Sequence, residues 1–126
     1  MKRLFVATAA LLCAALPVST ETVRIQSCYD GDTCRTSTGE RIRLACIETP
    51  ELRGTRANPV PAAAARDHLR QMVVDKDVTI RRVTTDRYGR TVAELFVGGT
   101  NVQQAMVTSG HADIYWRYSQ TCSWTR

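Results

Sequence analysis

The chain has 126 residues, with 17 basic and 12 acidic side chains and a formal net charge of +5, so one domain is expected. This mild positive charge permits a polyanionic partner without demonstrating one. After residue 18 no second long apolar run occurs, so the mature chain is expected to be soluble rather than to span a membrane.

The N-terminus has the layout of a secretory signal peptide. Two basic residues precede an apolar run from Leu4 to Val18, which small or polar residues follow. The run is shorter than the roughly 20 apolar residues that cross a membrane. A buried helix is the alternative, but the basic residues that precede the run favour export. We predict a signal peptide over residues 1–21, cut near Thr20 to Thr22, and a mature domain over residues 22–126. The protein would then be exported, either to the periplasm or to the medium.

The cysteines agree with export. Cys13 would leave with the signal peptide, which leaves an even number in a small exported domain and predicts two disulfides. From spacing alone, all three pairings are open. A zinc site is disfavoured because the gaps of 6, 12 and 76 residues differ from those of zinc ligands. The four remaining cysteines are Cys28, Cys34, Cys46 and Cys122.

The first part of the mature chain predicts three strands. Alternating residues predict a strand from Val23 to Cys28, and residues 33–37 can return beside it after an Asp-Gly turn. After a second turn, Ile42, Leu44 and Cys46 share one face of a third strand.

A loop and a helix follow. Residues 51–61 are rich in turn-forming residues, and the apolar residues from Ala65 to Val73 recur at helical spacing. Asp75 is expected to close this helix.

The rest of the domain predicts two strands and a second helix. Val78 and Ile80 share one strand face, and residues 91–97 form a fifth strand after a Tyr-Gly turn. Thr100 and Gln103 resemble a capping box for a short helix that ends near Gly110. Three strands, a helix, two strands and a short helix suit a five-stranded OB-fold barrel, an α+β class that is mainly β.

Three segments place charged residues where strands meet turns: residues 30–33, 43–51 and 86–90. Phosphodiester hydrolysis needs such groups, since guanidinium groups bind phosphate oxygens and a carboxylate can take a proton from water. A hard divalent cation would also find its preferred oxygen ligands here. An EF-hand is excluded because the acidic turn lacks that loop's later ligands. Each segment alone could equally be a solvated turn.

The motifs DGDT, RIRLACIETPE and DRYGR, in this order and near these spacings, resemble the staphylococcal nuclease (thermonuclease) family. The resemblance runs from about Val23 to Tyr118. It implies an OB barrel with helices and a monomeric Ca²⁺-dependent nuclease. Such an enzyme would hydrolyse the phosphodiester bonds of DNA and RNA with little sequence preference.

The resemblance also assigns roles to residues. Asp32 and Glu48, with the backbone carbonyl of Thr49, match calcium-binding positions, although the family usually has aspartate where Glu48 stands. Arg43 and Arg90 match the catalytic arginines, and Glu51 matches the glutamate assigned as general base.

The family's nucleotide contacts can be transferred in the same way. Arg87 and Tyr88 match residues near the terminal phosphate of a bound nucleotide, and Trp116 and Tyr118 match aromatic residues of the nucleotide pocket. Packing is the alternative role for the tail aromatics.

His68 and His111 match no role in the family and are expected to be surface or helix-side residues. Arg81 and Arg82 are expected to form a solvated face, with contact to a nucleic-acid backbone as the alternative.

The cysteine pairing can be narrowed at this point. A three-residue loop at residues 30–32 would place Cys28 opposite Cys34, whereas a two-residue loop would leave them staggered. Cys46 would then pair with Cys122. Some exported members of the family look similar.

Two other functions stay open. The domain could be an OB-fold module that binds nucleic acid without cleaving it, or a structural domain whose acidic turn binds calcium for stability. The joint presence of Arg43, Glu51 and Arg90 favours the nuclease over both.

Overall fold

The computed structural model describes residues 2–10 and 21–126. Most of the predicted signal peptide, including Cys13 and the stretch before the expected cleavage site, therefore lies outside the described residues. Within the described ranges, no helix combines the length and the apolar character needed to cross a membrane.

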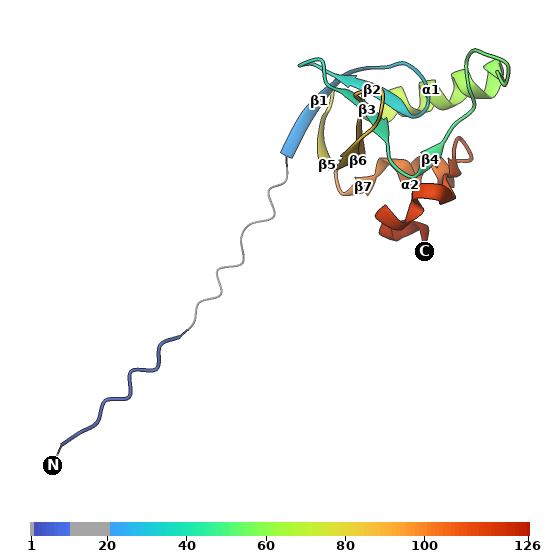
Figure 1. Cartoon of the computed structure of the whole chain (residues 1–126). Helices are drawn as coiled ribbons and strands as arrows, with labels where there is room; N and C mark the ends of the chain where they lie inside the picture. Colours follow the sequence, from blue (N-terminus) through green and yellow to red (C-terminus); the bar gives the residue numbers. More distant parts are fainter. Residues whose placement is uncertain (1, 11–20) are drawn as a thin grey trace.

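Strands and helices follow the predicted order, with additional short elements (Figure 1). The strands are β1 (Glu21–Cys28), β2 (Thr33–Thr36), β3 (Arg41–Leu44), β4 (Ile47–Glu48), β5 (Asp77–Thr85), β6 (Thr91–Val97), β7 (Thr100–Asn101) and β8 (Asp113–Ile114). The helices are α1 (Pro59–Val73), α2 (Val102–Thr108) and the 3₁₀ segments η1 (Trp116–Thr121) and η2 (Ser123–Thr125).

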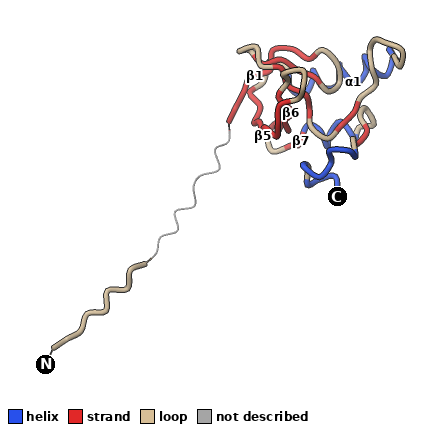
Figure 2. The backbone as a smooth tube through the Cα atoms, in the orientation of Figure 1, coloured by secondary structure: helices blue, strands red, loops and turns tan. Residues whose placement is uncertain are grey.

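Five strands close into a barrel, which confirms the predicted OB fold. The sheet order is β3-β2-β1-β5-β6-β7, and a parallel pairing of β3 with β6 closes it. β1 serves two neighbours: residues 21–24 pair with β5, and residues 25–28 pair with β2. In Figure 2 the strands cluster together while α1 and the helical turns of the tail lie at the periphery.

The third strand is shorter than predicted. β3 ends at Leu44, because its last partner on β6 is Ala93 and the chain then leaves the barrel. Cys46 lies in the following turn with φ = 67°, a left-handed conformation that is uncommon for a side chain other than glycine. This turn directs residues 47–48 into a separate two-stranded pairing of β4 with β8.

Helix α1 begins earlier than predicted. Pro59 and Pro61, which indicate a loop by composition, instead occupy the first turn, where a missing backbone N–H costs nothing. The buried face includes Ala65, Leu69 and Val73, as the spacing indicates. Asp75 follows the helix end with φ = 60°, and its backbone N–H donates to the carbonyl of Ile25.

The cap of α2 is one residue later than predicted. Asn101 caps the helix, and its side chain accepts a hydrogen bond from the backbone N–H of Gln104. Thr100 belongs to β7. Gln103 is fully buried and bonds both backbone groups of Leu95, so it anchors α2 to the barrel rather than completing a capping box.

The described residues contain two disulfides. Cys28 pairs with Cys34, with Cα atoms 3.9 Å apart at directly opposed positions of β1 and β2. Cys46 pairs with Cys122 and ties the C-terminal tail to the end of β3, with Cα atoms 6.5 Å apart. These are the two bridges expected from the sequence. The core surrounds the first bridge, and the second lies in a smaller apolar cluster with Ala45 and Trp124.

Arg81 and Arg82 are exposed, as the sequence predicts, and both also form ion pairs. Arg81 pairs with the buried carboxylate of Glu94. Arg82 pairs with Glu21 and Glu40, and these hydrogen bonds raise its pKa further above its ordinary value. Glu21, the last residue of the predicted signal peptide, is thus the first residue of β1 and part of an ion-pair cluster.

Candidate functional site

Two adjoining cavities lie where the three charged segments meet. The first cavity has a volume of about 340 Å³ and the second about 640 Å³. Arg43, Glu48 and Arg90 line both, so these three residues form a wall common to the two cavities. Cavities of about 300–1,000 Å³ are typical of small-ligand sites, so each offers room for a nucleotide.

The first cavity brings together six of the residues predicted from the sequence. They come from the β1–β2 turn, from β3 and β4, from the loop after β4 and from the end of the β5–β6 turn. The six are Asp32, Arg43, Glu48, Thr49, Glu51 and Arg90.

The acidic turn is held by its own hydrogen bonds. The backbone N–H of Asp32 donates to Asp30 Oδ1 over 3.1 Å, and Thr33 Oγ1 donates to Asp32 Oδ1 over 3.1 Å. The carbonyl of Asp32 also accepts from Leu44 N at 2.7 Å, which ties the turn to β3. Burial, followed by the neighbouring Asp32, raises the pKa of Asp30 to about 6. Negative charge is therefore concentrated here and poorly solvated.

Gly31 is required in this turn for space. A Cβ at this position would lie 2.8 Å from Cβ of Ala65 on α1 and 2.9 Å from Cγ2 of Thr49. Both distances are shorter than real Cβ contacts, so a side chain here would displace the turn from its two neighbours. The close packing fixes Asp32 relative to Thr49.

Arg43 is held on three sides. Its guanidinium donates to the carbonyls of Leu44 at 2.6 Å and Ile47 at 2.8 Å, and lies 3.4 Å from Asp32 Oδ2. The side chain is only 17% exposed. A guanidinium fixed in this way can bind an anion with little further loss of conformational freedom.

Arg90 is positioned by Asp86, a residue to which the sequence assigned no role. Asp86 Oδ2 accepts from Arg90 Nε at 2.7 Å, while Oδ1 accepts from the backbone N–H groups of Tyr88 and Arg90. Burial raises the pKa of Asp86, but these hydrogen bonds outweigh it and keep the pKa below its usual value. Asp86 therefore stays ionised and holds the Arg90 guanidinium at the common wall.

Arg41 anchors the same turn from the opposite strand. Its Nη2 donates to the carbonyl oxygen of Tyr88, and Gly89 leaves room for that guanidinium, since a Cβ there would lie 3.3 Å from Nη2. The pairing of Ile42 with Thr91 places residues 41 and 90 side by side where the barrel closes.

Glu51 occupies the loop after β4. Its backbone forms a bridge with Ala57, and its carbonyl accepts from the N–H of Asn58 at 2.9 Å. The exposed side chain lines the first cavity, and within residues 2–10 and 21–126 no hydrogen bond engages its carboxylate. That carboxylate can therefore accept a proton from a water molecule in the cavity.

The second cavity is lined by the 86–90 turn and by the C-terminal tail. Arg87 and Tyr88 lie in it, and the guanidinium of Arg87 stacks on the Tyr88 ring at 4.8 Å. Tyr118 lines it as well, with the ring of Tyr115 at 5.4 Å in an edge-to-face arrangement. Trp116, the other aromatic residue predicted for the nucleotide pocket, is 66% exposed and lines neither cavity.

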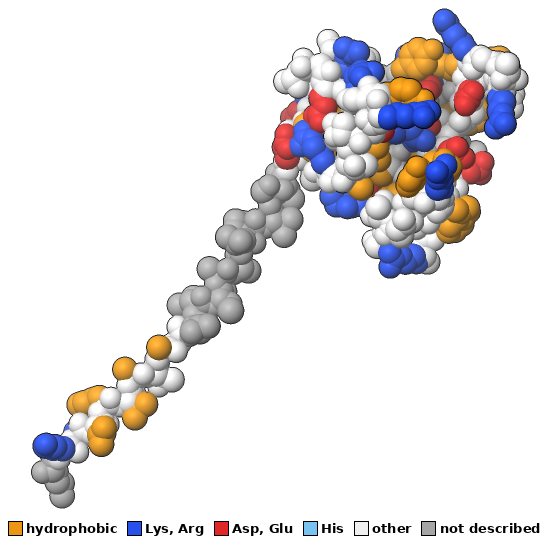
Figure 3. All heavy atoms as spheres, in the orientation of Figure 1, with side chains coloured by type: hydrophobic (Ala, Val, Ile, Leu, Met, Phe, Trp, Pro, Cys, Tyr) orange, Lys and Arg blue, Asp and Glu red, His pale blue; other side chains and the backbone are white. Residues whose placement is uncertain are grey.

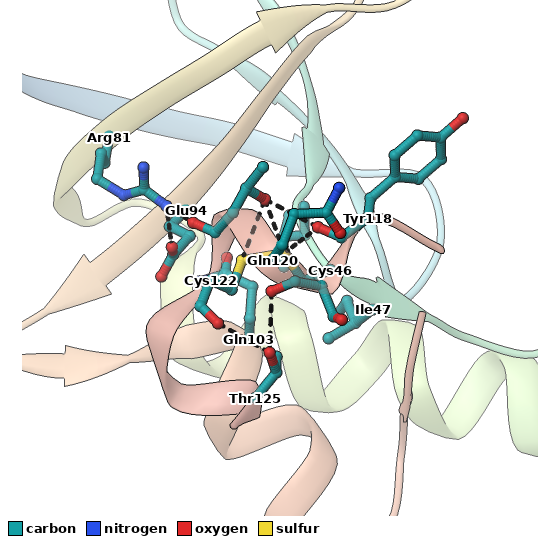
Figure 4. The surroundings of a disulfide bond; sticks show 12 residues. Cys46, Ile47, Arg81, Glu94, Gln103, Tyr118, Gln120, Cys122 and Thr125 are labelled. Atoms are coloured by element: carbon teal, nitrogen blue, oxygen red, sulfur yellow. Dashed lines mark hydrogen bonds and ion pairs between the residues drawn. A yellow bond between two sulfur atoms is a disulfide. The ribbon is translucent and has the colours of Figure 1, made fainter. Parts of the chain in front are cut away.

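The tail is attached to the barrel at several points (Figure 4). Besides the disulfide at Cys122, the backbone N–H of Tyr115 donates to the carbonyl of Cys46 at 2.8 Å. Arg81 Nη2 donates to the carbonyl of Thr121 at 2.6 Å. These attachments turn Tyr115 and Tyr118 toward the cavity and leave Trp116 outside.

The oxygen donors of the first cavity suit a hard cation. Asp32, Glu48 and the carbonyl of Thr49 provide oxygen ligands of the kind that calcium and magnesium prefer. The partly buried, crowded carboxylates of Asp30 and Asp32 would be relieved by a positive charge. In the part of the chain that the structure describes, no cluster of three or more His, Cys, Asp or Glu side chains is arranged around one metal position, so water would have to complete the coordination shell.

Several residues of the site were not predicted from the sequence. Tyr115 and Arg117 line the second cavity beside Tyr118, and Arg41 and Asp86 position the 86–90 turn. Residues 115–118 pass from extended chain into a 3₁₀ segment, so no period of 2 or 3.6 indicates which of them face inward. The spacing of Asp86 and Arg90, four residues apart across a tight turn, could have indicated that Asp86 holds Arg90.

The fold and the site together define an OB-fold protein with two fixed guanidinium groups and several carboxylates at the side of its barrel. The family model described as staphylococcal nuclease homologue matches residues 41–125, more than half of the chain. The chain belongs to this family.

Curated relatives agree. The chain is 32% identical over 100 residues to an uncharacterized endonuclease of Escherichia coli O157:H7, covering 76% of this chain and 62% of the relative. A staphylococcal-like nuclease, CAN1, of Arabidopsis thaliana is 37% identical over 79 residues, covering 62% of this chain and 22% of the relative. An uncharacterized endonuclease of Haemophilus influenzae is 32% identical over 102 residues, covering 78% of this chain and 54% of the relative. The chain thus spans less than two thirds of the length of these relatives.

Proposed function

We propose that this protein is an exported, calcium-dependent nuclease that hydrolyses phosphodiester bonds of DNA and RNA with little sequence preference. One observation carries the proposal: Arg43, Arg90 and Glu51 line the same cavity as Asp32, Glu48 and Thr49. The names of the relatives, endonuclease and staphylococcal-like nuclease, support the same activity.

The two arginines bind the scissile phosphate. Arg43 is held by the carbonyls of Leu44 and Ile47, and Arg90 is held by Asp86, so both cations are in position before the substrate arrives. Negative charge on the phosphoryl oxygens grows during attack by water, and fixed positive charges stabilise that state more than the ground state.

Glu51 acts as the general base. Its exposed carboxylate takes the proton from the attacking water, and the cavity provides room for that water beside the phosphate. The water attacks the phosphorus in line with the leaving oxygen, the bond from phosphorus to that oxygen breaks, and the leaving oxygen takes a proton from solvent.

Asp32, Glu48 and the carbonyl of Thr49 would hold the calcium ion, which would neutralise phosphate charge as a Lewis acid. Glu48 is one methylene longer than the usual aspartate, and the flexible coordination of calcium accommodates that difference. Asp30 adds negative charge beside these ligands.

Export is proposed from two features. The N-terminal segment has the composition of a signal peptide, and two disulfides are typical of proteins that fold in an oxidising compartment.

The test uses purified mature protein with plasmid DNA and with RNA, in calcium or in chelator. We expect both polymers to be degraded in calcium, with a loss of at least about 100-fold for Glu51→Gln. Binding without cleavage by the wild type would indicate a nucleic-acid-binding module instead. Cleavage unaffected by chelator would refute the calcium assignment.

A further inference from the structure

The two cavities form a groove with the proposed catalytic groups in its middle. Arg43, Glu48 and Arg90 belong to both cavities, whereas Arg53 lines only the first and Arg117 only the second. A polymer whose scissile phosphate lies at the common wall therefore has room for a nucleotide on each side.

Arg117 carries a charge that the protein leaves available. Within the described ranges no carboxylate pairs with it, and its guanidinium lies over the ring of Tyr118 at 5.6 Å from the centroid. Outside the common wall, Asp86 is the acidic residue that lines the second cavity, and Arg90 already engages it. A phosphate entering this cavity therefore meets an unneutralised guanidinium.

Arg53 is the counterpart in the first cavity. It is exposed, lies in the loop two residues after Glu51, and forms neither an ion pair nor a side-chain hydrogen bond within the part of the chain that the structure describes. Basic side chains are also visible beside exposed apolar ones on the face drawn in Figure 3.

We infer that Arg53 and Arg117 bind the phosphates on the two sides of the scissile phosphate, so that the groove favours a polynucleotide over a dinucleotide. The inference rests on the proposed nuclease function. An arginine–phosphate contact is a charge-assisted hydrogen bond, and its loss weakens binding by about tenfold. Each phosphate neutralised on a single strand also contributes about 0.7 to the slope of log affinity against log salt.

The first experiment compares a dinucleotide, which has one phosphodiester and no flanking phosphate, with a 12-nucleotide single strand. Arg53→Ala and Arg117→Ala should each raise KM for the longer substrate about tenfold and lower its salt slope by about 0.7, with KM for the dinucleotide unchanged. Arg117→Lys should restore part of the affinity, which separates loss of the cation from misfolding.

The chain offers matched controls for both positions. Arg56 lies in the same loop as Arg53, and Arg126 lies in the same tail as Arg117, yet neither lines a cavity. Arg56→Ala and Arg126→Ala remove the same charge and should retain the wild-type KM and salt slope. Equal effects from the controls would mean that only net charge matters, and would overturn the inference.

A second experiment assigns the sides. Oligonucleotides carry one ordinary phosphodiester, flanked on a chosen side by charged phosphorothioates or by neutral methylphosphonates. Removing the charge on the side that Arg53 contacts should raise KM for the wild type and for Arg117→Ala, but not for Arg53→Ala. Removing the charge on the other side should raise KM for the wild type and for Arg53→Ala, but not for Arg117→Ala. Loss of sensitivity on the same side in both variants, or in neither, would refute the assignment. If the wild type cleaves none of these substrates, the nuclease proposal itself fails.

Discussion

The guanidinium of Arg41 donates a hydrogen bond to the carbonyl oxygen of Tyr88 and so ties β3 to the turn that carries Arg87, Tyr88 and Arg90. The contact crosses the parallel pairing of β3 and β6, where the barrel closes. Arg41 does not line either cavity, so its effect on the site passes through the turn. It is a positioning residue.

Replacing Arg41 by Met keeps most of its apolar stem and removes the hydrogen bond. We expect kcat to fall roughly tenfold to a hundredfold, because Arg90 is no longer held in position for the transition state, while KM changes much less. Steady-state kinetics on an oligonucleotide would measure this. Arg41→Lys should recover part of kcat, since an ammonium can also donate to a carbonyl.

Arg35 provides the control. It pairs with Arg41 across β2 and β3, is also exposed, and forms no side-chain hydrogen bond within the described residues. Arg35→Met should therefore leave kcat unchanged. A similar loss in both variants would show that surface charge, not the anchor, is responsible.

Gly31→Ala should destabilise the fold by about 1–3 kcal/mol, because the new methyl group overlaps Ala65 and Thr49. Urea unfolding would report the change in free energy. Ala65→Gly removes one of the two overlaps, so the double variant should be more stable than the sum of the single changes predicts. Strict additivity would contradict the steric explanation.

The two disulfides should differ in their contribution to stability. Cys46 and Cys122 are 76 positions apart, whereas Cys28 and Cys34 are only 6 apart. The bridge from Cys46 to Cys122 therefore restricts the unfolded chain far more. Loop-closure entropy predicts a loss of about 4 kcal/mol for the Cys46→Ser/Cys122→Ser variant and about 2 kcal/mol for Cys28→Ser/Cys34→Ser. Denaturant unfolding of the two variants would test the order, and a larger loss for the short loop would contradict it.

Stability should also fall in acid through the histidine pair. The rings of His68 and His111 lie 4.5 Å apart, and burial together with His111 lowers the pKa of His68 below its ordinary 6.5. Below about pH 6.5, His68 binds a proton more readily in the unfolded chain than in the folded protein. The contribution of neutral His68 to stability is therefore complete above that pH, and it is lost as pH falls through the lower pKa of the folded state.

The measurement is the unfolding free energy between pH 5 and 7.5 for the wild type, His68→Gln and His111→Gln. Asp30, whose pKa is raised to about 6, acts in the opposite direction but is common to all three proteins. Both variants should therefore show a weaker loss of stability in acid than the wild type. An unchanged pH profile in His68→Gln would rule out the pair as its cause.

The sequence alone predicted the features that depend on the order of residues within a short segment. The alternation in β1, the apolar spacing of α1 and the turn residues between strands predict the barrel, because period and turn chemistry act within a few residues. The three motifs lie at strand ends, so the closure of one barrel brings Asp32, Glu51 and Arg90 into the same cavity.

Other features were decided only by the tertiary structure. Cys46 leaves β3 because the parallel pairing with β6 ends at Leu44, a contact between residues about 50 positions apart. The bridge from Cys46 to Cys122 then sets which face of the tail points inward, and so selects Tyr115, Arg117 and Tyr118 over Trp116. Such choices depend on contacts between distant segments, and no local pattern of residue types records them.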